Sequence, residues 1–245
     1  MGLLNVLLVV IGVLVPQFFF GEVDSISGKY LMGKLDYGHD SRFIMIDSKY
    51  ASQKGFFMRK EAYQAFIKME EAALKDGVVL KIISAVRGFD EQKTIWNAKW
   101  SGERLVEGKN LSKTVPDPYQ RALMILKFSS MPGSSRHHWG TDIDLNSLEN
   151  SYFLTGKGKN IYNWLKTNAS QYGFSNPYCE KGDLRQTGYE EEKWHWSFIP
   201  LSVKLLSVFK EKVKYQDFIH FKGCEEAEKV GIIENYVFGL NPDCK

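Results

Sequence analysis

The sequence has few of the residues that hold metal ions through sulfur. Only three of its 245 residues are cysteine, namely Cys179, Cys224 and Cys244, and no two of them form a CxxC pair. A thiolate metal site is therefore not expected. In an exported protein Cys224 and Cys244 could pair and fix the C-terminal tail, leaving Cys179 over, but the spacing does not decide the connectivity.

Strong charge of either sign is also lacking. The chain has 32 basic and 29 acidic residues, which are evenly scattered and give a net charge of +3. Nucleic-acid-binding proteins concentrate basic residues on one surface, so we predict no nucleic-acid partner. The sequence contains no glycine-rich phosphate loop and no acidic loop of calcium-binding spacing, so neither a phosphate-handling nor a calcium-handling protein is supported.

Charged side chains are absent from the first twenty residues, and neither Lys nor Arg occurs before Lys29. The apolar run over 3–20 is intermediate in length between the core of a signal peptide and a full membrane span. We therefore expect residues 1–22 to be a signal peptide or an N-terminal membrane anchor. The protein would then be periplasmic or attached to the cell envelope. The alternative is a buried N-terminal helix of the fold.

Helix and strand signals interleave along the chain without the regular rhythm of βαβ units. Apolar spacing predicts helices over 59–76, 91–100, 118 onward, 161–174 and 200–214. Asp90 is expected to cap the second helix, and Asp117 to precede the third with Pro118 at its first position. β-Branched or alternating residues predict strands over 78–86, 141–146 and 193–199. We therefore predict an α+β fold in which helices flank a short, mostly antiparallel sheet. One domain is expected over 23–215, followed by a helical appendage over 216–245.

Histidine is scarce, yet three of the five histidines stand beside carboxylates in two short stretches, SRHHWGTDID (135–144) and EKWH (192–195). A catalytic zinc ion usually takes three protein ligands, and His137, Asp144 and His195 would satisfy that count. On a straight strand His137 and Asp144 would point to opposite faces, so Trp139-Gly140 must form a bend. The alternative is that these side chains are hydrogen-bonded structural residues.

Alternation over 193–199 divides the second stretch between two faces. One face carries Lys193, His195 and Ser197, and the other carries Trp194, Trp196 and Phe198. Glu192 comes three residues before His195, and a bend there would bring it to a metal-bound water without making it a ligand. Zinc lowers the pKa of such a water to near neutral, and a carboxylate can then accept its proton. This arrangement predicts hydrolysis of an acyl group.

Residues 135–144 resemble the signature S-x-H-x-x-G-x-A-x-D of the zinc D-alanyl-D-alanine carboxypeptidases of the VanY type. EKWH matches the second signature of that family, E-x-W-H, and SAVRGFDEQ (84–92) is similar to its S-G-Y-R-S-x-x-x-Q segment. The three stretches occur in the family's order, and the likeness extends over roughly residues 28–210.

The resemblance implies the fold that these DD-peptidases share with the hedgehog signalling domain. It also implies one zinc ion held by His137, Asp144 and His195, with Glu192 as the catalytic base. Residues 23–215 would then be a zinc peptidase domain.

The resemblance further implies three residues that bind the substrate. Arg87 would anchor the substrate's carboxylate or the developing oxyanion, which suits a planar and permanently charged guanidinium. Ser135 and Gln92 would orient the end of the peptide. The alternatives are that Ser135 caps a turn and that Gln92 is a polar group at the start of a helix.

The sequence departs from the family signatures at several positions. Asp142 stands where the family has Ala, and it could either hydrogen-bond a neighbouring His or face solvent. Val86 and Gly88 replace the usual Tyr and Ser beside Arg87. His138 offers a competing ligand next to His137, which we prefer because it occupies the signature position.

The resemblance implies removal of the terminal D-amino acid from a peptidoglycan stem peptide or muropeptide. Two alternatives keep the same site, namely an L,D-carboxypeptidase acting on tetrapeptides and a dipeptidase acting on free D-Ala-D-Ala. A non-catalytic zinc-binding module is a further alternative, but such a module would not need Glu192 or Arg87.

Overall fold

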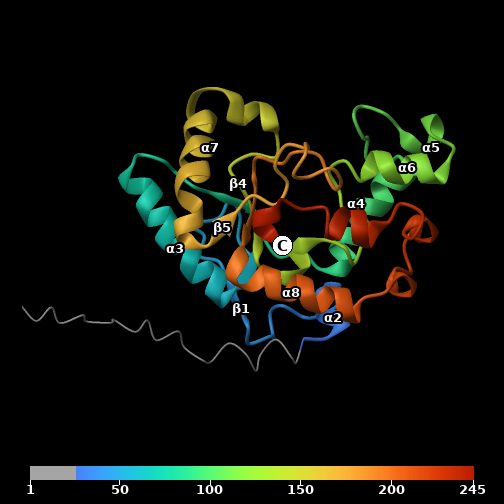
Figure 1. Cartoon of the computed structure of the whole chain (residues 1–245), viewed down its shortest axis with the longest axis horizontal. Helices are drawn as coiled ribbons and strands as arrows, with labels where there is room; N and C mark the ends of the chain where they lie inside the picture. The colour runs from blue at the N-terminus through green and yellow to red at the C-terminus, as the bar shows by residue number, and fades with distance from the viewer. Residues whose placement is uncertain (1–25) are drawn as a thin grey trace, which may run out of the picture.

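The central element of the fold is a four-stranded antiparallel sheet in the order β3-β4-β6-β5 (Figure 1). The computed structural model describes residues 26–245. The strands are short, with bounds β3 Ile82–Ser84, β4 Asp142–Leu145, β5 Phe174–Ser175 and β6 His195–Phe198. A separate antiparallel pair is formed by β1 (Phe43–Met45) and β2 (Phe57–Arg59). The predicted α+β fold with a short antiparallel sheet is confirmed.

Helices surround the sheet. The α-helices are α2 (Gly28–Leu31), α3 (Lys60–Lys75), α4 (Phe89–Ser101), α5 (Leu111–Thr114), α6 (Pro118–Ile125), α7 (Gly156–Asn168) and α8 (Ile199–Lys212). Short helical turns are η2 (Arg136–Trp139), η3 (Asn150–Leu154), η4 (Ala169–Tyr172), η5 (Tyr215–Asp217), η6 (Cys224–Glu226), η7 (Ile232–Val237) and η8 (Pro242–Cys244). In Figure 1, α3 and α7 lie on one side of the molecule, and α4, α5 and α6 lie on the other.

The predicted helices are present with shifted ends. Asp117 caps α6 as expected, because its carboxylate accepts a hydrogen bond from the Gln120 backbone amide. Asp90 does not cap α4, which is a correction: the helix begins two residues earlier than predicted, with Gly88 at the capping position, and Asp90 lies in its first turn. The predicted strand over 78–86 is also too long, since only Ile82–Ser84 pair with β4.

The buried hydrophobic side chains form two clusters. One combines Ile143 and Trp196 of the sheet with side chains of α3 and α7. The other combines Trp139 with side chains of α2, α4, α6 and α8, and with residues between Phe218 and Cys244. The residues after 215 thus share a core with the helices before them, and Figure 1 places the C-terminus against α8. The expected domain boundary at residue 215 stays a prediction.

Two further expectations concern the ends of the chain. The apolar segment over 3–20, and with it the expected signal peptide or anchor over 1–22, lies outside the described residues. None of the helices within residues 26–245 combines the length and the apolar character that a membrane crossing needs. Cys224 and Cys244 do not form the disulfide considered above, because all three cysteines are unpaired. Cys224 lies in η6, which contacts α6, whereas Cys244 lies in η8, which contacts α8.

Candidate metal centre

Three elements that are distant in sequence bring His137, Asp144 and His195 together. His137 lies in η2, Asp144 lies on β4, and His195 begins β6. The two strands pair in antiparallel register, with Asp144 directly opposite His195 and Asp142 opposite Ser197. Because alternate residues of a strand share a face, all four side chains project from the same face of the sheet. The predicted division of faces holds within β6, since Trp196 lies in the core on the opposite face. It fails before the strand begins, because Trp194 lines the same cavity as His195.

The bend that brings His137 back toward β4 occurs at Gly140, as predicted. Gly140 ends η2 with φ of 73°, in the left-handed region where a side chain is strained. A Cβ atom added there would lie 2.4 Å from the Phe43 ring and 3.1 Å from the Arg59 backbone nitrogen. The preceding residue, Trp139, is fully buried, and its indole donates a hydrogen bond to the Leu31 carbonyl oxygen at 3.0 Å. Glycine therefore permits both the turn and the close packing beneath it.

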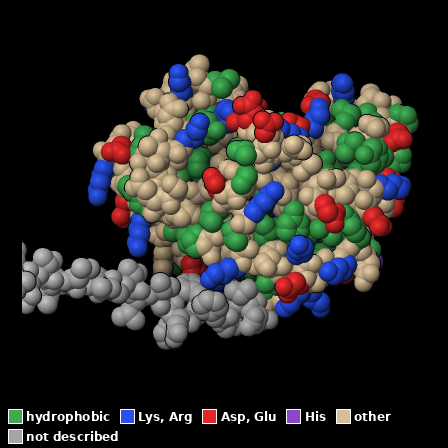
Figure 2. All heavy atoms as spheres, in the orientation of Figure 1, with side chains coloured by type: hydrophobic (Ala, Val, Ile, Leu, Met, Phe, Trp, Pro, Cys, Tyr) green, Lys and Arg blue, Asp and Glu red, His purple; other side chains and the backbone are tan. Residues whose placement is uncertain are grey.

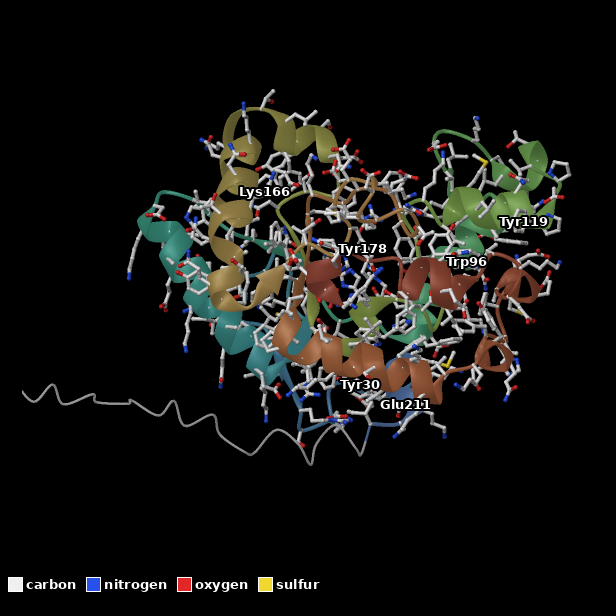
Figure 3. All side chains as sticks on the ribbon, in the orientation of Figure 1. Tyr30, Trp96, Tyr119, Lys166, Tyr178 and Glu211 are labelled. Carbon is white, nitrogen blue, oxygen red and sulfur yellow. The ribbon has the colours of Figure 1, made fainter. Side chains whose placement is uncertain are left out.

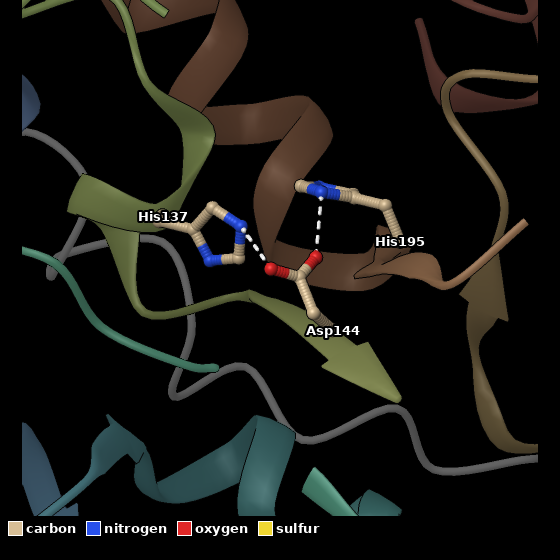
Figure 4. Close-up of side chains that lie close together, drawn as sticks. All are labelled: His137, Asp144 and His195. Carbon is tan, nitrogen blue, oxygen red and sulfur yellow. Dashed lines mark ion pairs between the residues drawn. The ribbon is translucent and has the colours of Figure 1, made fainter. Parts of the chain in front are cut away.

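The two histidines approach Asp144 from opposite sides (Figure 4). His137 Nε2 lies 3.3 Å from Asp144 Oδ2, and His195 Nδ1 lies 3.1 Å from Asp144 Oδ1. One ligand atom from each of the three residues lies within 4.8 Å of the other two. This is the donor set, two imidazole nitrogens and one carboxylate oxygen, that catalytic zinc sites use.

Hydrogen bonds on the far sides of the rings fix which nitrogens are free. His137 Nδ1 lies 2.8 Å from the Ala85 carbonyl oxygen, which can only accept, so this nitrogen carries the proton. His195 Nε2 lies 2.9 Å from Asp142 Oδ2 and donates to it in the same way. His137 Nε2 and His195 Nδ1 are therefore the nitrogens that face Asp144 and that a metal ion would use. Without a metal ion, burial lowers the pKa of His195, but hydrogen bonds to Asp142, Asp144 and Glu192 outweigh it and raise the pKa well above its usual value. Metal binding would thus displace a proton from Nδ1.

The Asp144 carboxylate supports the same interpretation. Its Oδ1 atom is buried and accepts no well-aligned hydrogen bond, although His195 Nδ1 is near. Burial alone would raise the pKa of Asp144, but His137 and His195 outweigh it and hold the pKa well below its usual range. A buried, ionised oxygen without a donor favours a cation. The residues present therefore fit a divalent metal ion such as zinc.

Asp142 connects the centre to a buried arginine. Its Oδ2 atom accepts from Arg136 Nε at 2.9 Å, and its Oδ1 atom accepts from the Ser197 hydroxyl at 2.8 Å. Burial would raise the pKa of Asp142, but Arg136 and His195 lower it well below the usual value. Asp142 thus stays ionised and orients His195, which decides between the two roles considered for it.

Glu192 lies beside the His137-Asp144-His195 cluster, at a slightly longer distance than those that join its three members. Its Oε2 atom is 3.4 Å from His195 Nδ1, and its side chain is buried. Burial raises the pKa of the Glu192 carboxyl, and Asp144 adds to the rise while His195 opposes it. Asn176 holds this turn, since its amide donates to the backbone oxygens of Glu192 and His195 at 2.8 Å each.

The three residues expected to bind substrate differ in position. Arg87 Nη2 is 4.0 Å from Asp144 Oδ2, and both Arg87 and Ser135 line the cavity that contains the cluster. Gln92 does not line this cavity. It accepts a hydrogen bond from Arg87 Nη1 at 3.0 Å and donates to the Ser130 carbonyl oxygen at 2.7 Å, so it holds Arg87 in place.

His138 does not compete as a ligand. Its Nδ1 donates to the Arg87 carbonyl oxygen at 2.6 Å, and its Nε2 accepts from the Gly133 amide at 3.1 Å. Both nitrogens are occupied and the side chain is fully buried. Burial lowers the pKa of His138 to about 3, so it is a neutral structural residue.

The cluster opens into a cavity of about 550 Å³. Its walls include Lys99 and Phe128 on the α4–α6 side, and Leu148 and Asn150 on the side that leads to α7. Figure 2 shows the surface hollowed between these two sides. Tyr178, near the centre of the molecule in Figure 3, packs its ring 4.7 Å from that of His195. The volume suits a short peptide.

Sequence reasoning missed Arg136, Asn176 and Tyr178. The pairing of Arg136 with Asp142 could have been inferred, because a basic residue and an aspartate in place of the signature's Ala occur within one short motif. Asn176 and Tyr178 lie in a segment without regular structure, and no spacing rule connects them with His195.

Comparison with known proteins gives the affiliation of the chain. Residues 55–201 match the family model VanY, described as D-alanyl-D-alanine carboxypeptidase. The chain belongs to the VanY family. The predicted resemblance is thereby confirmed, and the matched segment contains every residue of the cluster.

Two proteins illustrate the relationship in sequence. The chain is 31% identical over 150 residues to YodJ of Bacillus subtilis, a match that covers 58% of this chain and 46% of YodJ. It is 33% identical over 94 residues to an uncharacterized protein of Haemophilus influenzae, covering 37% of this chain and 64% of that protein. The chain therefore matches less than two thirds of the length of either relative.

The fold has a solved counterpart. A zinc-bound mutant of the vancomycin-resistance D,D-pentapeptidase VanY, from a VanB-type resistance cassette, is similar with a TM-score of 0.50 and 19% identity. The match covers 72% of this chain and 88% of that one. At this identity the likeness concerns the fold, and it agrees with the α+β architecture described above.

Proposed function

We propose that this protein is a zinc-dependent D-alanyl-D-alanine carboxypeptidase that removes the terminal D-amino acid from peptidoglycan stem peptides. The observation that carries the proposal is the position of Glu192, a buried carboxylate beside a His-Asp-His donor set in a cavity of peptide size. A metal-binding module has no need of a base there. Membership of the VanY family supports the reaction class.

The side chains divide the chemistry among them. His137, Asp144 and His195 would hold one zinc ion, which when bound supplies Lewis acidity at the scissile carbonyl. Glu192 would take a proton from the attacking water and return it to the leaving amine. A raised pKa suits this exchange, because the carboxyl can hold the proton between the two steps.

Arg87 would stabilise the negative charge that develops on the carbonyl oxygen or bind the terminal carboxylate. Its guanidinium is fixed by Gln92 and by the Ser84 hydroxyl at 2.9 Å, so little reorganisation is needed during the reaction. Ser135, which lines the same cavity, would contact the end of the peptide. Stem peptides lie outside the cytoplasm, so the proposal includes export, with residues 3–20 as the segment that directs or anchors it.

The test is digestion of defined substrates followed by mass spectrometry. Purified protein is incubated with tripeptide, tetrapeptide and pentapeptide stems and with free D-Ala-D-Ala, in the presence of zinc and after removal of metal by a chelator. We expect zinc-dependent loss of one D-alanine from the pentapeptide. Cleavage of the tetrapeptide alone would assign an L,D-carboxypeptidase, and cleavage of D-Ala-D-Ala alone a dipeptidase. If zinc-loaded protein shortens no substrate, the proposal is wrong.

A further inference from the structure

Lys99 is a cation inside the cavity that the roles above do not use. It lies on α4, seven residues after Gln92, and two turns of helix place both side chains on the same face. Lys99 lines the cavity together with Arg87, and its ammonium donates a hydrogen bond to the Ser129 hydroxyl. The side chain is therefore held toward the space that a substrate would fill.

No carboxylate within residues 26–245 lies in ion-pair distance of the Lys99 ammonium. Burial, followed by the positive charges of Arg104 and Arg87, lowers the pKa of Lys99 to about 8, and only Glu192 opposes the shift. Partial burial and neighbouring positive charges destabilise the charged form of a lysine unless an anion lies close to it. This environment favours the binding of a negatively charged group from outside the chain.

Lys99 and Arg87 are tied to consecutive residues of one loop. Lys99 contacts Ser129, while Arg87 is held through Gln92, whose amide donates to the Ser130 carbonyl oxygen. Arg87 reaches to within 4.0 Å of Asp144 and so serves the metal end of the cavity. Seven residues correspond to about 10 Å along a helix. A peptide whose reacting carbonyl lies near Arg87 can therefore extend a second polar group toward Lys99.

We propose that Lys99, supported by Ser129, binds a carboxylate of the peptide substrate and so determines which peptides are cleaved efficiently. This inference depends on the proposed function, since it assumes that the cavity receives a peptide. A stem peptide offers two sources of the carboxylate. One is the C-terminal carboxylate, and the other is the free α-carboxylate of its D-glutamate.

The experiment measures binding and therefore needs no turnover. Glu192→Gln protein, loaded with zinc, is titrated by calorimetry with three peptides. These are a pentapeptide stem with a free C-terminus, the same peptide as its C-terminal amide, and the same peptide with the D-glutamate α-carboxylate amidated. The titrations are repeated with Lys99→Met, with Lys99→Arg, and with Lys93→Met as a matched control. Lys93 lies on the same helix and does not line the cavity.

We expect Lys99→Met to weaken binding of the free peptide by about 10- to 100-fold, the usual range for a hydrogen bond to a charged group. Lys99→Arg should restore most of the affinity, and Lys93→Met should leave it unchanged. The peptide that already lacks the recognised carboxylate should not lose further affinity with Lys99→Met. That peptide identifies which of the two carboxylates Lys99 binds.

Equal losses for all three peptides, or no loss for any, would overturn the role of Lys99. Turnover of the stem peptides by the unsubstituted protein tests the proposed function separately. If the protein cleaves the pentapeptide but Lys99→Met does not change peptide affinity, only the role of Lys99 is refuted and the proposed function stands.

Discussion

Asp142 accepts a hydrogen bond from His195 Nε2 at 2.9 Å, on the side of the imidazole that faces away from Asp144. The signature that residues 135–144 resemble has Ala at this position, and an alanine side chain could not accept this hydrogen bond. A buried aspartate would be destabilising by itself, and Arg136, six residues earlier, supplies the compensating charge. Arg136 and Asp142, which belong to the same ten-residue motif, thus act together to hold His195 in position.

The support given by Asp142 is testable through metal affinity. Asp142→Ala removes the acceptor that orients His195, and we expect zinc affinity to fall about 10- to 100-fold. The same change leaves Arg136 buried without its partner, which should cost about 3–5 kcal/mol in the free energy of unfolding. Competition with a zinc chelator and denaturant unfolding measure the two effects.

A double variant separates the two effects. Arg136→Met combined with Asp142→Ala should recover most of the stability, since no unpaired charge is left, but it should not recover the zinc affinity. Wild-type zinc affinity in the double variant would show that Asp142 has no part in orienting His195.

The role of Glu192 predicts a loss of rate without a loss of metal. Glu192→Gln removes the proton acceptor while keeping the size of the side chain, so we expect kcat on the pentapeptide to fall about 10²- to 10⁴-fold. Bound zinc, measured by metal analysis, should stay at one ion per chain. Glu191→Gln is the matched control, because Glu191 pairs with Lys193 and does not line the cavity. Unchanged turnover in Glu192→Gln would disprove the assignment.

The pH dependence of peptide binding should reflect Lys99. Its pKa is lowered to about 8 by burial and by Arg104 and Arg87, with Glu192 acting in the opposite direction. Lys99 is charged below this pH and neutral above it, so the affinity for a carboxylate-bearing peptide should decrease as pH rises through about 8. In Lys99→Arg the charge persists, and the decrease should move to higher pH. An identical alkaline decrease in both proteins would assign it to another group.

Two glycines with the same φ angle test the packing at the bend that positions His137, with Gly77 as the control for Gly140. Gly77 and Gly140 both have φ of 73°, but a Cβ atom would meet nothing within 4 Å at Gly77 and would meet Phe43 at 2.4 Å at Gly140. Gly77→Ala should lose about 1–2 kcal/mol in the free energy of unfolding, the cost of the left-handed backbone. Gly140→Ala should lose about 1–3 kcal/mol more, because of the clash. Denaturant unfolding of the two variants compares them, and equal losses would contradict the described contact.

The three thiols should differ in reactivity. Cys179 and Cys224 are partly exposed, whereas Cys244 is fully buried, and burial raises the pKa of its thiol to about 11. At pH 8 Cys244 therefore stays protonated and shielded, so a thiol reagent should modify two cysteines in the native protein and three after unfolding. Fewer than three thiols in the unfolded, unreduced protein would reveal a disulfide and contradict the unpaired state.

The sequence was most informative where a local pattern determines geometry. Alternation correctly placed His195 and Ser197 opposite Trp196, and Gly140 correctly marked the bend, because both depend on short-range backbone rules. Trp194 was misplaced, because the strand begins only at His195. The predicted start of α4 was wrong by two residues, since Asp90 is a suitable cap but Gly88 already occupies that position. Arg136, Asn176 and Tyr178 could not be predicted, because their roles depend on tertiary contacts with a turn that no periodicity describes.

The register of β4 against β6 has a consequence for folding. Asp144 faces His195 only when the two strands pair as described, and a slip of one residue would turn every side chain of the slipped strand to the other side of the sheet. A chain folded with that error would present Trp196 to the ion and hide the imidazole in the core. Zinc would thus bind to correctly aligned molecules alone, and a supply of the metal during refolding would enrich them at the expense of misaligned ones.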